Sequence, residues 1–226
     1  MPLDDNPLAL FPPLSDPSES AYVSPPAVSG LPRVLLLGDS ISIGYTLPVR
    51  ELLANTATVH RPAANCGQTA FALRHLEDWL GTESWDAIHF NFGLHDLKYL
   101  DQDGSYVTPP RGRLVAPIEV YRRNLDALVT RLVATGATPI FATTTPVPMG
   151  AAGRLAGSER SYNQCASEVM RAHGVAVTDL WSLAAKRQSE ILRPNDVHFT
   201  NEGYLELATL VAQGIRAALP ASSASR

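Results

Sequence analysis

Short apolar runs alternate along this chain with longer segments in which apolar residues recur at helical spacing. Residues 34–37 read Val-Leu-Leu-Leu, and further strand-like runs follow at 56–60, 87–92, 139–143 and 175–178. Continuous apolar runs are typical of strands buried on both faces, and segments of about ten or more residues between them can form crossover helices. The alternation therefore predicts an α/β domain whose parallel sheet is covered by helices on both faces.

The segments between the strands carry helix signals. A first helix is expected over residues 47–54, Pro117 and Ser158 mark the starts of two others, and Gly81 and Gly136 stand where C-cap glycines are common. Each of four helices has one apolar stripe. These stripes comprise Phe71, Leu73, Leu76, Trp79 and Leu80; Ile118, Tyr121, Leu125, Leu128 and Leu132; Tyr162, Cys165, Val169 and Met170; and Tyr204, Leu207, Val211 and Ile215.

The chain of 226 residues fits one domain with short extensions. Residues 1–32 hold eight of the eighteen prolines, which predicts a Pro-rich N-terminal arm without helix or central strand. This arm is either disordered or packed against the domain or a second subunit. We assign residues 33–220 to the domain and 221–226 to a C-terminal tail.

Charge and hydropathy restrict the partners. The net charge is −4 and no Lys/Arg run stands out, so nucleic acid and anionic membrane surfaces are poor candidates. No apolar stretch approaches the roughly 20 residues that span a bilayer. The N-terminus lacks the positive region of a secretory signal, which favours a cytoplasmic location and leaves export open. The sequence does not set the oligomeric state. Cys66 and Cys165 are expected as buried free thiols, with a disulfide as the alternative.

Four polar segments fall after predicted strands or before the last helix. They are Gly38-Asp39-Ser40, residues 65–69 (Asn-Cys-Gly-Gln-Thr), residues 93–96 (Gly-Leu-His-Asp) and residues 195–198 (Asn-Asp-Val-His). Ligands of parallel α/β sheets bind outside the carboxyl ends of the strands, so these segments are expected to converge on one site.

The residue types in these segments favour nucleophilic catalysis. A serine hydroxyl needs a base within hydrogen-bond reach, and His198 can provide it for Ser40. A tetrahedral oxyanion needs preorganised donors. The backbone N–H groups of Ser40 and Gly67 are two candidates, and a side chain from residues 93–96 is a third.

In their order and placement these segments resemble those of the SGNH hydrolase superfamily, also called GDSL esterases and lipases. The resemblance extends from Val34 to about Ala218 and includes residues 144–148, Tyr162-Asn163 and residues 196–204. It implies a three-layer α/β/α, flavodoxin-like fold with a parallel five-stranded sheet in the order 2-1-3-4-5. It also implies that Ser40 is the nucleophile, that Gly67 is an oxyanion donor, and that carboxylic esters are hydrolysed without a metal or other cofactor.

Two positions depart from the family pattern. The family's third segment normally carries an asparagine as oxyanion donor, and here that position is His95, as in a subgroup of GDSL proteins. A neutral imidazole has one N–H to donate, so His95 is expected to complete the oxyanion hole; the alternative is a histidine that braces the loop. The family's acid usually lies three residues before the histidine, where this chain has Asn195. We assign the acid to Asp196, with Asn195 or a backbone carbonyl as alternatives.

The expected substrate is a short-chain ester, because no lid domain is present to bury a long acyl chain, and family analogy favours acetylated carbohydrates. A thioesterase or acyltransferase using the same nucleophile is the main alternative. A metal-dependent phosphoesterase, suggested by Gly-Leu-His-Asp, and a non-catalytic carbohydrate-binding protein are others. His89 and Asn91 are expected as buried, hydrogen-bonded scaffold residues, Cys66 as a packing residue, and residues 101–113 as a loop beside the site.

Overall fold

The computed structural model describes residues 21–219. Its main sheet contains five parallel strands in the order β2-β1-β3-β6-β7. Counted over these five strands, the order is 2-1-3-4-5, which confirms the prediction. The strands are β1 (Arg33–Leu37), β2 (Thr58–His60), β3 (Ala87–Phe90), β6 (Thr138–Ala142) and β7 (Ala176–Thr178).

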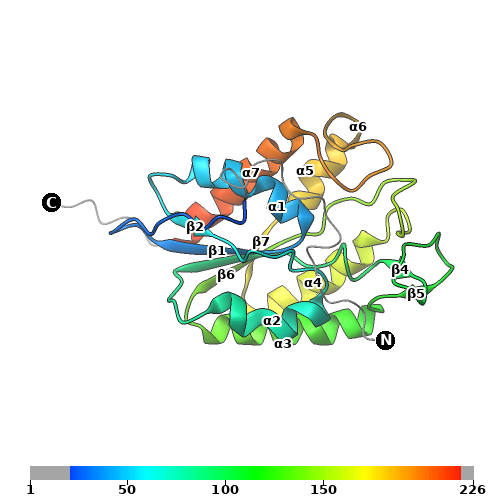
Figure 1. Cartoon of the computed structure of the whole chain (residues 1–226), viewed down its shortest axis with the longest axis horizontal. Coiled ribbons are helices and arrows are strands. Elements are labelled where there is room, and N and C mark those ends of the chain that lie inside the picture. Colours follow the sequence, from blue (N-terminus) through cyan, green and yellow to red (C-terminus); the bar gives the residue numbers. More distant parts are fainter. Residues whose placement is uncertain (1–20, 220–226) are drawn as a thin grey trace.

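Helices cover both faces of this sheet and give the expected three layers (Figure 1). On one face lie α1 (Ser40–Leu52), α5 (Leu180–Lys186), α6 (Gln188–Ile191) and α7 (Asn201–Ala218). On the other face lie α2 (Thr69–Leu80), α3 (Ile118–Ala134) and α4 (Glu159–His173). A small antiparallel hairpin of β4 (Tyr99–Leu100) and β5 (Arg113–Leu114) lies outside the main sheet and was not predicted. It carries the loop of residues 101–112.

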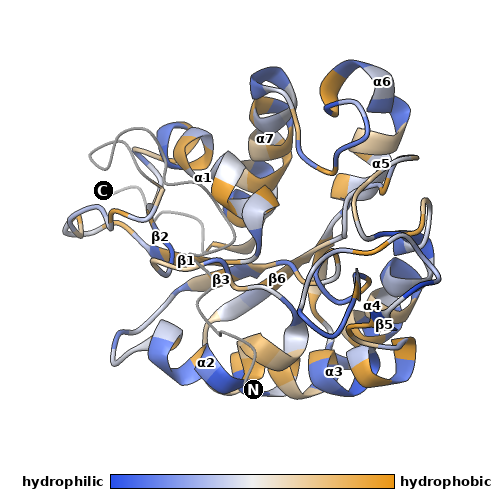
Figure 2. Cartoon of the chain, turned by 45° about the vertical axis from the view of Figure 1, so that its right-hand side comes forward, coloured by the Kyte–Doolittle hydropathy of each residue, from blue (hydrophilic) through white to orange (hydrophobic). Residues whose placement is uncertain are grey.

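The core lies between the sheet and the two helical layers. Val34, Leu35, Leu36 and Leu37 of β1 are all buried, as expected of a central strand covered on both sides. Helices α2, α3 and α7 carry polar and apolar residues on different faces, visible as alternating blue and orange along their ribbons (Figure 2). The predicted stripe of α4 is entirely buried, and in α7 Leu207, Val211 and Ile215 are buried while Tyr204 is half-buried.

Helix α1 begins seven residues earlier than predicted, directly at the end of the loop that follows β1. The carboxylate of Asp39 caps it by accepting a hydrogen bond from the Ile41 N–H at 3.0 Å. The turn-like Gly38-Asp39-Ser40 therefore also starts the helix, which places Ser40 at its first position. Further along α1, a Cβ on Gly44 would lie 2.2 Å from Cε1 of Tyr204 in α7, so this glycine permits the close approach of the two helices.

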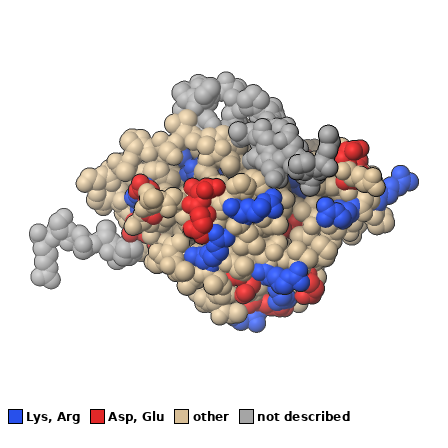
Figure 3. Space-filling model, turned by 60° about the horizontal axis from the view of Figure 1, so that its bottom comes forward, with Lys and Arg blue, Asp and Glu red and all other residues tan. Residues whose placement is uncertain are grey.

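Charged side chains link the helices of the outer layers. Arg122 of α3 pairs with Glu168 of α4 at 2.6 Å, and Arg131 of α3 pairs with Glu77 of α2 at 2.5 Å. Basic and acidic side chains are accordingly interspersed on the face viewed in Figure 3. Exposed pairs of this kind contribute about 0–1 kcal/mol each, so the helices are held mainly by their apolar stripes.

Part of the predicted N-terminal arm packs against the domain. Residues 21–32 contain no helix or strand, but Ala21 is buried and the Val28 N–H donates to Thr58 Oγ1 of β2 at 3.3 Å. The guanidinium carbon of Arg61 lies 5.7 Å from the centroid of the Tyr22 ring. The rest of the arm, residues 1–20, and the predicted tail, 221–226, lie outside the described residues.

Cys66 and Cys165 are both buried and form no disulfide, as the free-thiol interpretation predicted. Asn91 is buried and donates to the Ala142 carbonyl at 2.8 Å. For His89 the prediction of a hydrogen-bonded side chain was wrong: it is fully buried, and neither ring nitrogen has a partner among residues 21–219. Burial lowers its pKa to about 3, so the ring is accommodated as a neutral aromatic beside Tyr45. Within the same residues, no helix combines the length and hydropathy needed to cross a bilayer.

Candidate active site

The carboxyl edge of the sheet brings Ser40, His198 and Asp196 into one hydrogen-bonded chain. Ser40 Oγ lies 2.8 Å from His198 Nε2, and His198 Nδ1 lies 2.7 Å from Asp196 Oδ1. If Nδ1 carries the ring proton and donates it to Asp196, then Nε2 is free to accept the Ser40 hydroxyl proton. Ser40 and His198 are 158 residues apart in sequence, and they meet because α1 and α7 pack side by side.

The loop between α6 and α7 explains how an acid only two residues before the histidine can reach its ring. Asp196 Oδ1 also accepts the backbone N–H of His198 at 3.3 Å, so one carboxylate oxygen binds both the main chain and the ring of the same residue. Asn195 adopts a positive φ of 57°, which turns the chain just before Asp196. Burial acts to raise the pKa of Asp196, but the hydrogen bond and charge of His198 hold it below its ordinary value.

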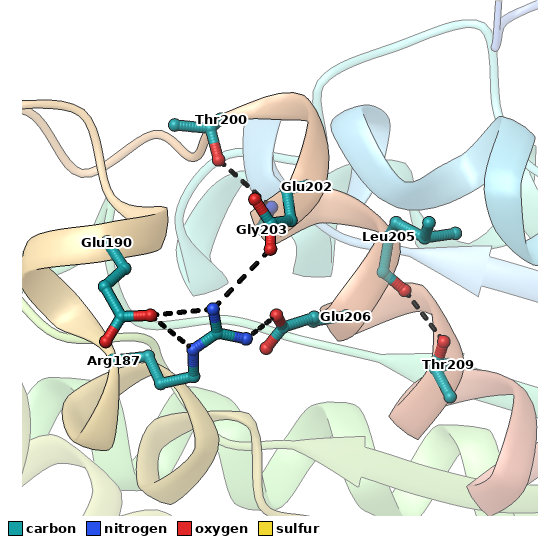
Figure 4. A network of polar contacts seen from close by, with 8 residues as sticks. All are labelled: Arg187, Glu190, Thr200, Glu202, Gly203, Leu205, Glu206 and Thr209. Atoms are coloured by element: carbon teal, nitrogen blue, oxygen red, sulfur yellow. Dashed lines mark hydrogen bonds and ion pairs between the residues drawn. The ribbon is translucent and has the colours of Figure 1, made fainter.

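Ion pairs and a helix cap also link the elements on either side of this loop. Arg187 precedes α6 and binds Glu190 of α6 at 2.7 Å, Glu202 of α7 at 3.5 Å and Glu206 of α7 (Figure 4). The Thr200 hydroxyl caps α7 by accepting the Gly203 N–H at 3.1 Å. The loop itself is closed by main-chain hydrogen bonds, from the Arg193 N–H to the His198 carbonyl at 2.9 Å and from the Thr200 N–H to the Ile191 carbonyl at 2.8 Å.

Gly67 and His95, the two further oxyanion donors expected from the sequence, lie close together. A Cβ on Gly67 would be 4.0 Å from His95 Nδ1, and the φ of this glycine is +60°. The Gly67 N–H donates to Asn65 Oδ1 at 3.0 Å, so an oxyanion would have to share or replace that acceptor. The N–H of Ser40 lies at the N-terminus of α1, where backbone N–H groups and the helix dipole favour negative charge.

Asp96 joins the third polar segment to the second. It is fully buried and accepts hydrogen bonds from the Thr69 N–H at 3.0 Å and the Thr69 hydroxyl at 2.5 Å. Burial raises its pKa to about 7, against the lowering effect of the Thr69 hydrogen bonds. This contact ties the loop of His95 to the start of α2 and so sets the position of His95 relative to Gly67.

The remaining family-like residues support the same edge. The Asn163 amide binds both the N–H and the carbonyl of Thr144 at 2.8 Å each, and Tyr162 donates to the Ala116 carbonyl at 2.5 Å. A Cβ on Gly93 would lie 2.0 Å from Thr144 Oγ1, which explains the glycine at the start of the His95 loop. Cys66 is fully buried, and burial raises its thiol pKa to about 11, which fits a packing role rather than a nucleophile.

A cavity of about 480 Å³ opens onto this arrangement. Its lining combines Ser40, Asp196 and His198 with His95, Arg154 and, from the loop of residues 101–112, Tyr106. The long loop therefore does contribute to the site, as its length suggested. Arg154 is fixed by hydrogen bonds from its Nε to the Leu94 carbonyl at 2.9 Å and from Nη1 to the Ala152 carbonyl at 3.2 Å.

Sequence reasoning missed Lys98, Tyr106 and Arg154 as site residues. The Lys98 ammonium lies 2.9 Å from His95 Nδ1 and 4.9 Å from the centroid of the Tyr106 ring. The turn of residues 94–97 brings His95 and Lys98 to the same side. The spacing of three residues between them was the one sequence feature that could have indicated this contact. Tyr106 lies in the loop of residues 101–113 that was expected beside the site, but no pattern singled out this residue, and nothing in the sequence marked Arg154.

A serine, a histidine and an aspartate joined in series at the carboxyl edge of a parallel α/β sheet are the arrangement of a serine hydrolase. The comparisons with known proteins specify the class further. Residues 36–205 match the GDSL-like Lipase/Acylhydrolase family, and the chain belongs to that family. It is thus a carboxylic ester hydrolase, and a serine nucleophile and an oxyanion hole are typical of its relatives.

Solved structures share the fold at low sequence identity. A lipase/acylhydrolase from Enterococcus faecalis matches with a TM-score of 0.69 and 21% identity over 86% of this chain and 100% of the other. An acetylxylan esterase from Geobacillus stearothermophilus matches with a TM-score of 0.66 and 15% identity over 81% of this chain and 94% of the other. A GDSL-like lipase from Bacteroides thetaiotaomicron matches with a TM-score of 0.61 and 16% identity over 89% of this chain and 95% of the other. A search of curated protein sequences finds no match.

Proposed function

We propose that this protein hydrolyses short-chain carboxylic esters through an acyl-enzyme intermediate on Ser40. The observation that carries the proposal is the continuous chain from Ser40 Oγ to His198 at 2.8 Å and from His198 to Asp196 at 2.7 Å, open to a cavity. This geometry provides a nucleophile, a base and a group that orients the base.

In the first half-reaction Ser40 Oγ attacks the ester carbonyl while His198 Nε2 takes the hydroxyl proton. The resulting imidazolium is stabilised by the carboxylate of Asp196. His198 then protonates the leaving alcohol, and the acyl group remains on Ser40. In the second half-reaction His198 removes a proton from water, which attacks the acyl carbonyl; the bond between the acyl carbon and Ser40 Oγ then breaks, Oγ takes the proton back from His198, and the acid is released.

The oxyanion is proposed to bind the N–H of Ser40, the N–H of Gly67 and the ring of His95. Burial is the main reason that the pKa of His95 lies well below its ordinary value, and the cations Lys98 and Arg154 add to the effect. The ring is therefore neutral at pH 7 and has one N–H to donate. The Gly67 N–H can join when the oxyanion competes with Asn65 Oδ1 for it.

For the substrate we propose acetyl or other short acyl esters, with acetylated carbohydrates first. The lining of the cavity of about 480 Å³ includes Tyr106, Arg154 and Asn195, whose polar atoms can bind the hydroxyl groups of a carbohydrate alcohol. The acetylxylan esterase with the same fold is consistent with this choice.

A panel of p-nitrophenyl esters of graded chain length and of acetylated sugars tests the proposal, with Ser40→Ala as the control. We expect rates that are highest for acetyl esters, resistant to EDTA and lost in Ser40→Ala. Equal hydrolysis by Ser40→Ala, or no hydrolysis of any ester, would exclude the proposal. Adding an acceptor alcohol separates acyl transfer from hydrolysis, because a transferase would yield the new ester in place of free acid.

A further inference from the structure

Lys98 is a buried cation that the ester-hydrolysis mechanism leaves without a role. It is 5% exposed, and no carboxylate within residues 21–219 forms an ion pair with it. Its ammonium contacts His95 Nδ1 at 2.9 Å and the face of the Tyr106 ring at 4.9 Å. Buried charges are normally paired, because an unpaired ion loses its hydration without compensation. Burial of the Lys98 charge therefore costs free energy, which an apolar side chain at the same position would not.

The hydrogen bond to His95 has only one possible direction when Lys98 is charged. An ammonium group has three donors and no acceptor, so His95 Nδ1 must accept and cannot carry a proton. In a neutral ring the proton then lies on Nε2. That nitrogen has no partner within residues 21–219, and His95 lines the cavity beside Ser40. The family's usual asparagine amide needs no such control, because its NH₂ group is always a donor.

We propose that Lys98 is a positioning residue that holds His95 in the Nε2–H tautomer, so that the ring presents a donor to the oxyanion. The inference rests on the proposed function, because it assumes the oxyanion role of His95. Lys98 itself stays outside the reaction: His95 lines the cavity and Lys98 does not, so the lysine acts through the ring. The pair His95–Lys98 thus replaces a side-chain amide by an imidazole whose tautomer is set by the lysine.

The first test is the tautomer itself, read from the ¹⁵N NMR signals of the His95 ring. The chain has six histidines, so His95→Asn identifies the two signals of this residue by their loss. Burial lowers the pKa of Lys98 to about 7, so the spectra are recorded below pH 7, where the ammonium is mostly charged and we expect the wild-type ring to be protonated at Nε2 only. In Lys98→Met the ring should populate both tautomers. A wild-type ring protonated at Nδ1, or a tautomer unchanged in Lys98→Met, would overturn the proposal whatever the activity.

The second test is kinetic. Loss of a whole oxyanion donor costs about 10²–10³-fold in kcat. Lys98→Met leaves part of the population in the donating tautomer, so we expect a smaller loss, about tenfold in kcat, with KM little changed. The matched control is Lys186→Met, which changes the only other lysine of the chain, an exposed residue at the end of α5. It should keep wild-type kcat.

A double-mutant cycle separates this role from direct stabilisation of the oxyanion by the lysine charge. In a His95→Ala background Lys98→Met should change kcat little, because the ring through which it acts is gone. The same tenfold loss in both backgrounds would overturn the proposal. If Lys98→Met does not fold, the proposal is still tested by the tautomer of the wild-type ring and of the ring in Lys98→Arg. Because arginine retains a charged donor, we expect His95 to be protonated at Nε2 in both proteins. A failure of the ester-hydrolysis proposal would appear separately, as activity that survives Ser40→Ala.

Discussion

Replacing Asp196 by alanine tests which group orients the catalytic base. Asp196 Oδ1 accepts two hydrogen bonds from His198, one from the ring at 2.7 Å and one from the backbone at 3.3 Å. A hydrogen bond to a charged group contributes about 1.5–3 kcal/mol, and the side chain of Asp196 is 38% exposed, which favours the lower end. Since about 1.4 kcal/mol corresponds to a factor of ten in rate, we expect kcat to fall about 10-fold and at most about 100-fold.

The assay is steady-state hydrolysis of p-nitrophenyl acetate, with urea unfolding to establish that the variant is folded. KM should change little, because Asp196 acts on His198 and on the imidazolium that forms in the transition state. Asn195→Ala is the comparison variant: Asn195 occupies the family's usual acid position, but no hydrogen bond joins its side chain to His198 in the described structure, and because it lines the cavity its loss is expected in KM rather than in kcat. An unchanged kcat in Asp196→Ala, or a larger loss in Asn195→Ala, would refute the assignment.

Two further predictions concern stability. Gly44→Ala should lower the free energy of unfolding by about 1–3 kcal/mol in urea titrations, because its Cβ would lie 2.2 Å from the Tyr204 ring; an equal loss in a Tyr204→Ala background would contradict this cause. Burial, with Arg154 nearby, lowers the pKa of Lys98 from 10.5 to about 7, so between these values the unfolded chain binds more protons than the folded one. Unfolding free energy should therefore rise with pH in this window, by up to about 1.4 kcal/mol per unit, and this contribution should disappear in Lys98→Met but remain in Lys186→Met.

Most of the fold could be predicted from the sequence because the main strands and helices are long enough for their apolar patterns to be recognised. The run of residues 34–37 and the stripe on α4 are buried as their patterns predicted. Strands β4 and β5 have two residues each, which is too short for an alternation to be visible. The start of α1 was misplaced because a helix can begin directly after a strand when the carboxylate of Asp39 caps it.

The candidate site was predictable as far as its residues belong to recognisable segments. Ser40, His198, Asp196, Gly67 and His95 were all named from sequence, and the structure places them around one edge of the sheet. What sequence could not supply were contacts that depend on local turns and long-range packing. Tyr106 reaches the cavity from a loop, and Lys98 contacts His95 across a single turn. The hydrogen bond from the Gly67 N–H to Asn65 Oδ1 likewise depends on how the loop folds and was not predictable from the sequence.

The central claim is that Ser40 is the nucleophile, and covalent trapping measures it most directly. The protein would be treated with an organophosphonate ester, and the intact mass and proteolytic peptides would be determined by mass spectrometry. We predict one adduct per chain, located on Ser40, with loss of esterase activity in proportion to labelling. Ser40→Ala should remain unlabelled, and His198→Ala should be labelled far more slowly because the base is missing. Labelling at another residue, or full activity in a chain whose Ser40 is modified, would contradict the account.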